Sequence, residues 1–102
     1  MPSYALTPEA DADLEDIARY TILEWGVEQA KRYMNKLDQC FQKIGTKKVV
    51  GRTFSNRMPN VLVIRCEHHF VFYLHPSTEK PVILAVLHER MDMVNRLQDR
   101  LA

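Results

Sequence analysis

Two amphipathic helical patterns follow one another in this sequence with a single glycine between them. Thr7 can cap the first helix and Pro8 suits its first position, so the pattern has a clear start. Gly26 ends the first pattern and Gly45 ends the second. A helical hairpin over about residues 7–45 is therefore expected. Because neither helix can bury its apolar stripe alone, another element must cover both.

After the hairpin, the apolar residues no longer recur at helical spacing and instead form short continuous runs. Runs of strand length, rich in β-branched and aromatic residues, occupy 61–67, 69–75 and 81–88. The segment 45–60 contains glycine, proline and several bases, and we expect it to be a basic loop. A short apolar stretch at 3–6 can form an edge strand.

These patterns predict the order β-α-α-β-β-β followed by a C-terminal helix. With 102 residues, the chain has the size of one domain. We expect an α+β fold in which the helical hairpin covers one face of an antiparallel sheet. The β-meander would span about 61–88, and the helical tail about 89–101.

The register of the first two meander strands decides which side chains meet the helices. A turn at 67–69 would pair Cys66 with Phe70 and place one apolar set on the helices: Leu62, Ile64, Cys66, Phe70, Phe72 and Leu74. The other face would then carry Val63, Arg65, Val71 and Tyr73. A two-residue turn at Glu67-His68 would mix these sets. The first register is preferred, because it leaves Arg65 in solvent.

Charge is distributed unevenly, although the net charge is only +1. Residues 1–38 carry eight acids and four bases, whereas 39–66 carry six bases and no acid. The low net charge argues against a general nucleic-acid binder. The basic segment is either a solvated loop or a binding surface for an acidic partner segment or for phosphates.

No part of the sequence indicates a membrane or secreted protein. No apolar run approaches the roughly 20 residues that a membrane span needs, and the N-terminus lacks the pattern of a signal peptide. The two cysteines, Cys40 and Cys66, match no zinc or redox spacing. We expect reduced thiols in a cytoplasmic protein.

The stretch CEHHFVFYLHP at 66–76 raises the possibility of a metal site. His68 and His69 would point to opposite faces of a strand, and His69 and His75 would lie about 20 Å apart. Zinc needs all its ligands within about 2.3 Å of one ion. The stretch therefore predicts a β-hairpin, and neither a metal nor another cofactor is expected.

Arg65, Tyr73 and His88 could share the open face of the predicted sheet. A cation beside groups that move protons would suit metal-free phosphodiester cleavage. The structural interpretation is that Tyr73 packs at the sheet rim and His88 caps the following turn. On the residues alone, the structural interpretation is favoured.

Three segments carry a resemblance to a known family: TPEADADLEDIARYTILEWG, RCEHHFVFY and ILAVLHERMD. In this order they resemble toxins of the RelE/ParE superfamily, the toxin halves of bacterial type II toxin–antitoxin operons. The resemblance spans about residues 4–100 and implies the element order derived above. RelE-like members cut messenger RNA in the ribosome, whereas ParE-like members inhibit DNA gyrase.

The match to the RelE-like branch is incomplete. Arg65 and Tyr73 fall on an arginine and a tyrosine of that branch. Its other functional positions, an arginine, a C-terminal tyrosine and two lysines, fall on or near Glu89, Asn95, Asn56 and Met58. An acid at Glu89 would repel a scissile phosphate. As a metal-independent endoribonuclease, the chain would use Arg65, His69, Tyr73 and His88.

The C-terminal sequence LHERMDMVNRLQDRL resembles the ParE-like branch, whose last strand runs into a similar motif and a helical tail. The resemblance implicates this segment in acting on gyrase. The target-binding residues that it implies are His88, Arg90, Met91, Asp92 and Arg96. We therefore expect a gyrase-inhibiting toxin that arrests growth and supports plasmid maintenance, without catalytic residues. The alternative is the ribosome-dependent endoribonuclease, or a binding module without a target.

The resemblance also implies a protein partner, the cognate antitoxin. Antitoxin tails are often acidic, which would give the basic segment a use. The expected antitoxin-binding residues are Lys47, Lys48, Arg52, Arg57 and Arg65. Higher-order toxin–antitoxin assembly is possible within the family, and no membrane or specific nucleic-acid partner is expected.

Overall fold

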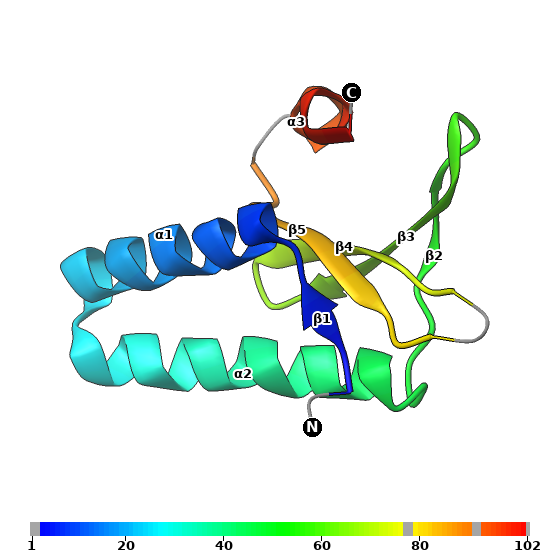
Figure 1. The fold of residues 1–102 in the computed structure, drawn as a ribbon. Helices are drawn as coiled ribbons and strands as arrows, with labels where there is room; N and C mark the ends of the chain where they lie inside the picture. Colours follow the sequence, from blue (N-terminus) through cyan, green and yellow to red (C-terminus); the bar gives the residue numbers. More distant parts are fainter. Residues whose placement is uncertain (1–2, 77–78, 91–92, 102) are drawn as a thin grey trace.

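The computed structural model describes residues 3–76, 79–90 and 93–101, and it has the predicted α+β class (Figure 1). A long helical hairpin packs beside a twisted sheet, and a short C-terminal helix lies apart from that hairpin. The elements in chain order are β1 (Ala5–Leu6), α1 (Pro8–Trp25), α2 (Val27–Gly45), β2 (Arg52–Ser55), β3 (Met58–Cys66), β4 (His69–Leu74), β5 (Val82–His88) and α3 (Met93–Leu101).

The helical hairpin begins and turns where the sequence predicted. The Thr7 hydroxyl accepts a hydrogen bond from the Ala10 N–H at 3.1 Å, and Pro8 occupies the first turn of α1. Gly26 has a φ of 90°, which favours glycine, and its N–H donates to the Ile22 carbonyl. The chain therefore reverses at a single residue and starts α2 at once.

The sheet is mixed, with the strand order β1-β5-β4-β3-β2. The antiparallel meander β3-β4-β5 agrees with the prediction, but β1 runs parallel to β5. Part of the predicted loop also forms β2, where Arg52 pairs with Val63 and Thr53 with Leu62. This short strand depends on its pairing with β3, because strand preference is set by context more than by local sequence.

The preferred register of β3 and β4 was wrong. Cys66 pairs with His69, and the chain turns at Glu67-His68 with a Glu67 φ of 57°. Val71 and Tyr73 therefore face the helices, and Phe70 faces the opposite side. The prediction failed because these strands are apolar on both faces, so that either register buries an apolar set.

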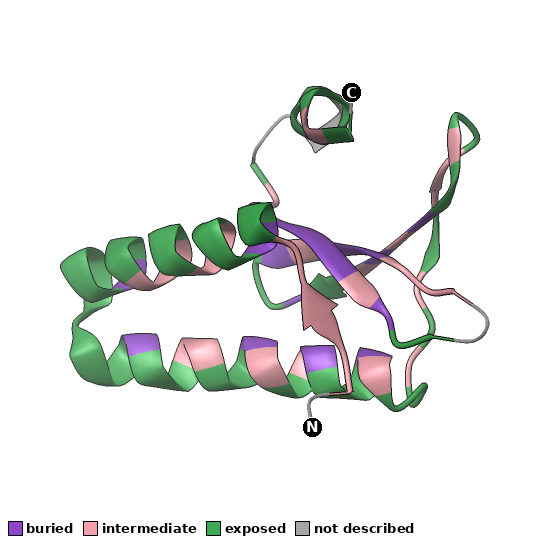
Figure 2. Cartoon of the chain, viewed as in Figure 1, coloured by how far each residue is buried: buried purple, intermediate pink, exposed green. Residues whose placement is uncertain are grey.

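Both faces of the sheet carry a buried apolar cluster. Figure 2 shows buried residues along the central strands and on the side of α2 that faces α1. The cluster under α1 and α2 comprises the buried residues Ala10, Leu37, Phe41, Ile44, Cys66, Val71, Tyr73, Ile83 and Val86. The cluster on the opposite face comprises Val61, Val63, Phe72, Leu84, Ala85, Leu87 and Leu97. Leu97 belongs to α3, so the C-terminal helix covers part of the second face.

Side chains of α1 and α3 close the outer edge of β5 beyond the two residues of β1. The Thr7 hydroxyl donates to the Leu84 carbonyl at 3.3 Å, and the Asp13 carboxylate accepts from the Val86 N–H at 2.9 Å. Arg100 donates to the Leu84 carbonyl at 3.2 Å. These contacts satisfy backbone groups that an edge strand would otherwise expose.

Within the described residues, no helix combines the length and the apolar character needed to cross a membrane.

Candidate functional site

The sheet face opposite the hairpin carries an apolar hollow over β2, β3 and β4. Its volume is about 400 Å³, and it is lined by Arg52, Thr53, Phe54, Val63, Phe70 and Phe72. We call this hollow, with Arg65 at its edge, the sheet groove. The Phe54 and Phe72 rings meet edge to face at 5.0 Å between centroids, which fixes its floor. The sheet groove is an apolar surface that a partner side chain could fill.

Arg65 lies at the edge of the sheet groove and is held from several sides. Its guanidinium carbon lies 5.7 Å from the centroid of the Phe70 ring, and its Nε donates to the Glu67 carbonyl. Its Nη2 lies 2.5 Å from Glu89 Oε2, and Glu89 Oε1 lies 3.4 Å from His68 Nδ1. Glu89 therefore neutralises part of the positive charge of Arg65, the residue that the sequence suggested as a phosphate-binding group.

A separate polar cluster lies on the helix side, at the end of the sheet. The Tyr33 hydroxyl accepts from the His68 N–H at 3.1 Å, so its own proton is free to go to His69 Nδ1 at 2.5 Å. The rings of His69 and His88 are 5.2 Å apart. Burial, followed by the neighbouring His88 and His68, lowers the pKa of His69 to about 4. His69 is therefore a buried neutral imidazole near neutral pH.

The same cluster does not form a metal centre. Among the described residues, histidine, cysteine, aspartate and glutamate side chains form no group of three or more suited to hold a metal ion.

The four residues of the nuclease alternative do not come together. Tyr73 is fully buried on the helix side, where its hydroxyl accepts from the Gly51 N–H at 2.7 Å. Arg65 lies on the opposite face of the sheet, whereas His69 and His88 pair on the helix side. The expectation that Arg65, Tyr73 and His88 share one open face was wrong, because it rested on the incorrect register.

The expected antitoxin-binding bases are dispersed along the β2 side of the molecule. Arg52 and Arg65 border the sheet groove, whereas Arg57 lies in the turn between β2 and β3. Lys47 and Lys48 follow α2, before β2 begins. All five side chains are exposed.

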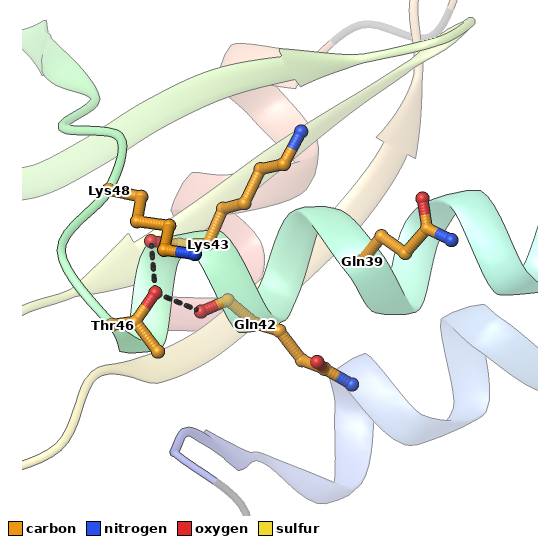
Figure 3. Close-up of a pocket in the computed structure, with 5 residues that line it drawn as sticks. All are labelled: Gln39, Gln42, Lys43, Thr46 and Lys48. Atoms are coloured by element: carbon orange, nitrogen blue, oxygen red, sulfur yellow. Dashed lines mark hydrogen bonds between the residues drawn. The ribbon is translucent and has the colours of Figure 1, made fainter.

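Lys48 also lines a shallow polar hollow of about 260 Å³ at the end of α2 (Figure 3). The other lining residues are Gln39, Gln42, Lys43 and Thr46. The Thr46 hydroxyl donates to the Gln42 carbonyl at 2.9 Å, which caps the helix end. This hollow is the surface of a helix terminus that carries two lysines.

The expected target-binding residues lie at and beyond the end of β5. His88 Nδ1 accepts a hydrogen bond from the Arg90 N–H at 3.1 Å. His88 therefore caps the turn after β5, which is the non-catalytic role that the sequence suggested for it. Arg90 and Arg96 are exposed. Met91 and Asp92 lie outside the described residues.

Sequence reasoning missed the aromatic floor of the sheet groove and the Tyr33–His69 contact. A signal for the groove was present, because Phe70 and Phe72 alternate with Val71 and Tyr73. A strand that is apolar at every position indicates that both of its faces are covered or bind something. The Tyr33–His69 contact joins a helix to a strand 36 positions away, and no local pattern indicates it.

Comparison with known proteins agrees with the resemblance. The family model described as the ParE toxin of the type II toxin–antitoxin system parDE matches residues 4–93. Toxin ParE of Escherichia coli is 45% identical over 101 residues, covering 99% of this chain and 98% of that protein. Toxin ParE1 of Caulobacter vibrioides is 33% identical, with 90% and 94% covered.

A solved structure supports the fold independently. The chromosomal ParDE toxin–antitoxin system from P. aeruginosa contains a chain that matches with a TM-score of 0.71 at 21% identity, covering 86% of this chain and 96% of that one. At this identity the match concerns the fold alone. The family model and the E. coli relative establish the family as well as the fold, because each covers most of the sequence. The chain therefore belongs to the ParE toxin family of type II toxin–antitoxin systems.

Proposed function

We propose that this chain inhibits DNA gyrase, arrests growth, and is neutralised by direct binding of a cognate antitoxin. The observation that carries the proposal is the 45% identity to Toxin ParE of E. coli over nearly the whole of both chains. The proposal places the toxin in the cytoplasm, where gyrase acts on DNA. It requires no catalytic side chain in the toxin, because inhibition follows from binding.

The C-terminal segment is the proposed contact with gyrase. Its expected contact residues are His88, Arg90, Met91, Asp92 and Arg96. The Asp13–Arg100 ion pair fastens the end of α3 to α1, at 2.7 Å between Nη1 and Oδ2. Arg96 lies on the same short helix and is exposed, so it is presented from a fixed support. A fixed support lowers the ordering cost of binding.

The sheet groove is the proposed binding site for the antitoxin. Its phenylalanine floor would take apolar side chains of the antitoxin tail, and Arg52 and Arg65 would meet acidic residues at the rim. The dispersed positions of Lys47, Lys48 and Arg57 suit a second role, which is long-range attraction of an acidic segment. In this proposal, Arg52 and Arg65 contact the bound antitoxin tail, whereas the other three bases raise its association rate.

The experiment that tests gyrase inhibition titrates purified toxin into gyrase with relaxed plasmid and ATP. We expect loss of supercoiling or accumulation of linear plasmid, prevented when the antitoxin is added first. The double variant Arg90→Glu/Arg96→Glu should lose most of this effect. Arg19→Glu/Arg32→Glu reverses two exposed bases on the helical hairpin and should retain it. Full supercoiling at excess folded toxin would sink the proposal.

A translation assay distinguishes the endoribonuclease alternative. Under the gyrase proposal, toxin added to a cell-free translation mixture leaves the messenger RNA intact. Cleavage of ribosome-bound message, lost in Arg65→Ala, would replace the proposal with the alternative. Tyr73 and Arg65 lie on opposite faces of the sheet, so no observation favours the four-residue nuclease site.

A further inference from the structure

We propose that Cys40 and Cys66 form a thiol modification site at which a peroxide converts the two free thiols into a reversible disulfide between α2 and β3. The inference concerns the helix side of the sheet and is independent of gyrase binding. Both cysteines are free in the structure. Cys66 belongs to the apolar cluster under the hairpin, and Cys40 packs against the same cluster.

The position of the Cys66 sulfur carries the argument. Its Sγ lies 3.7 Å from the carbonyl oxygen of Lys36, to which it donates. In an α-helix, that carbonyl accepts the hydrogen bond of the residue four positions on, which is Cys40. The Cys66 sulfur is therefore placed against the one helical turn that leads from Lys36 to Cys40.

The direction of the Cys40 side chain brings the second sulfur to the same place. Helical side chains point back toward the N-terminus and cover the preceding turn. Cys40 is therefore directed toward the turn that begins at Lys36. Each thiol is the largest influence on the pKa of the other, which agrees with two neighbouring sulfurs. Cα atoms of α2 and β3 come within 8 Å of one another where the two elements meet, and a disulfide spans Cα atoms up to about 7 Å apart.

The two thiols differ in reactivity, which sets their order of reaction. The neighbouring Cys66 thiol, and after it Lys43, lower the pKa of Cys40. The neighbouring Cys40 and burial raise the pKa of Cys66. Cys40 is partly exposed, whereas Cys66 is buried. Thiolates react with oxidants and thiols do not, so Cys40 attacks first and Cys66 resolves.

The chemistry needs hydrogen peroxide and no other reactant. The Cys40 thiolate attacks the O–O bond, a sulfur–oxygen bond forms, and hydroxide leaves to become water. Cys66 loses its proton and attacks the Cys40 sulfur, the sulfur–oxygen bond breaks, and a second water leaves as the disulfide forms. Two thiols lose two electrons, and one peroxide becomes two waters. A dithiol reductant reverses the reaction.

The experiment treats the folded full-length chain with hydrogen peroxide, blocks the remaining thiols, and measures the intact mass and the non-reduced peptides. We expect a monomer that has lost two hydrogens and a peptide pair joined through Cys40 and Cys66. Reduction should restore both thiols. The oxidised protein should also unfold at a higher temperature than the reduced protein, because the bridge restricts the unfolded chain.

Single-cysteine variants test the order of reaction. In Cys66→Ser, Cys40 should accumulate as a sulfenic acid that a cyclic 1,3-dione captures. In Cys40→Ser, the Cys66 thiol should remain unmodified until the protein is unfolded. Wild-type protein that forms only intermolecular dimers, only sulfinic acid at Cys40, or no product would overturn the proposal. The wild-type peptide map decides this even where a variant fails to fold.

Discussion

Asp13 of α1 and Arg100 of α3 form a two-point ion pair across 87 positions of sequence. Arg100 Nη1 lies 2.7 Å from Asp13 Oδ2, and Arg100 Nη2 lies 3.1 Å from Asp13 Oδ1. Both side chains are largely buried, at 22% and 14% exposed. The pair fastens the end of α3 to α1 at the outer edge of β5, and fork-like geometry makes it stronger than a typical surface pair.

Asp13→Ala is expected to lower the free energy of unfolding by about 2–4 kcal/mol. It leaves the Arg100 guanidinium without its partner and the Val86 N–H without its acceptor. Urea unfolding followed by circular dichroism measures the change. Asp16→Ala is the matched control, because the Asp16–Arg19 pair is exposed at 74% and 67%. Equal effects of the two variants would contradict a structural role for the Asp13 pair.

Stability is expected to fall between pH 6.5 and about pH 4 because of His69. Its pKa is near 4 in the folded protein and 6.5 when unperturbed, so only the unfolded chain takes up the proton in this interval. The full contribution is present above pH 6.5 and amounts to about 3 kcal/mol at most. Urea unfolding at several pH values measures the slope for the wild type and for His69→Gln.

His69→Gln keeps an acceptor for the Tyr33 hydroxyl but cannot titrate, so its slope should be shallower. His75→Gln removes another histidine of the meander and should leave the wild-type slope unchanged. A wild-type slope in His69→Gln would show that other groups cause the acid sensitivity.

Tyr73→Phe is expected to destabilise the fold by about 1–2 kcal/mol. The Tyr73 hydroxyl is the acceptor for the Gly51 N–H, and its loss leaves that donor unsatisfied. Gly51 is also crowded, since a Cβ there would lie 2.7 Å from the Val63 carbonyl, so the loop has little freedom to find another acceptor. Thermal unfolding checks this, with Tyr20→Phe at an exposed position as the control. Equal midpoints for Tyr73→Phe and the wild type would refute the role.

Reversing two charges on the β2 side, one at the sheet groove and one in the β2–β3 turn, is expected to weaken antitoxin binding by about tenfold or more and to flatten its salt dependence. The variant Arg52→Glu/Arg57→Glu is compared with Lys31→Glu/Arg32→Glu, which has the same net charge but alters α2. Titration against the cognate antitoxin at several salt concentrations gives the affinity and the slope of its salt dependence. If the salt dependence of binding is unchanged in Arg52→Glu/Arg57→Glu, the basic segment does not bind the antitoxin and is only a solvated surface.

The sequence indicated the hairpin well because Thr7, Pro8 and Gly26 act locally. A cap, a fixed φ and a left-handed residue each constrain their own neighbours and need no tertiary contact. The α+β class followed from the order of such elements, whereas the family was identified from the resemblance of three sequence segments. The same reasoning identified the capping role of His88, since the turn it caps is adjacent in sequence.

The β3–β4 register could not be predicted because the deciding contact is distant. Alternation specifies register only when one face is polar, and here Leu97 of α3 covers the second face. The Glu67-His68 turn also lacks the glycine or asparagine that usually marks a two-residue hairpin turn. Arg65 lies on the predicted face in either register, but the placement of Tyr73 and of the phenylalanine floor of the sheet groove depends on the register, so the error spread to the candidate site.

The closed edge of β5 has a consequence for assembly. Within the described residues, backbone groups of this edge form hydrogen bonds with the side chains of Thr7, Asp13 and Arg100. The neighbouring strand β1 extends that side of the sheet by only two residues. The opposite edge of the sheet is β2, and in the described part of the chain no further strand pairs with it. Edge-to-edge growth of a sheet through many copies needs two open edges on each copy, whereas one open edge pairs only once. A toxin built this way can bind an extended partner segment without polymerising through its own sheet.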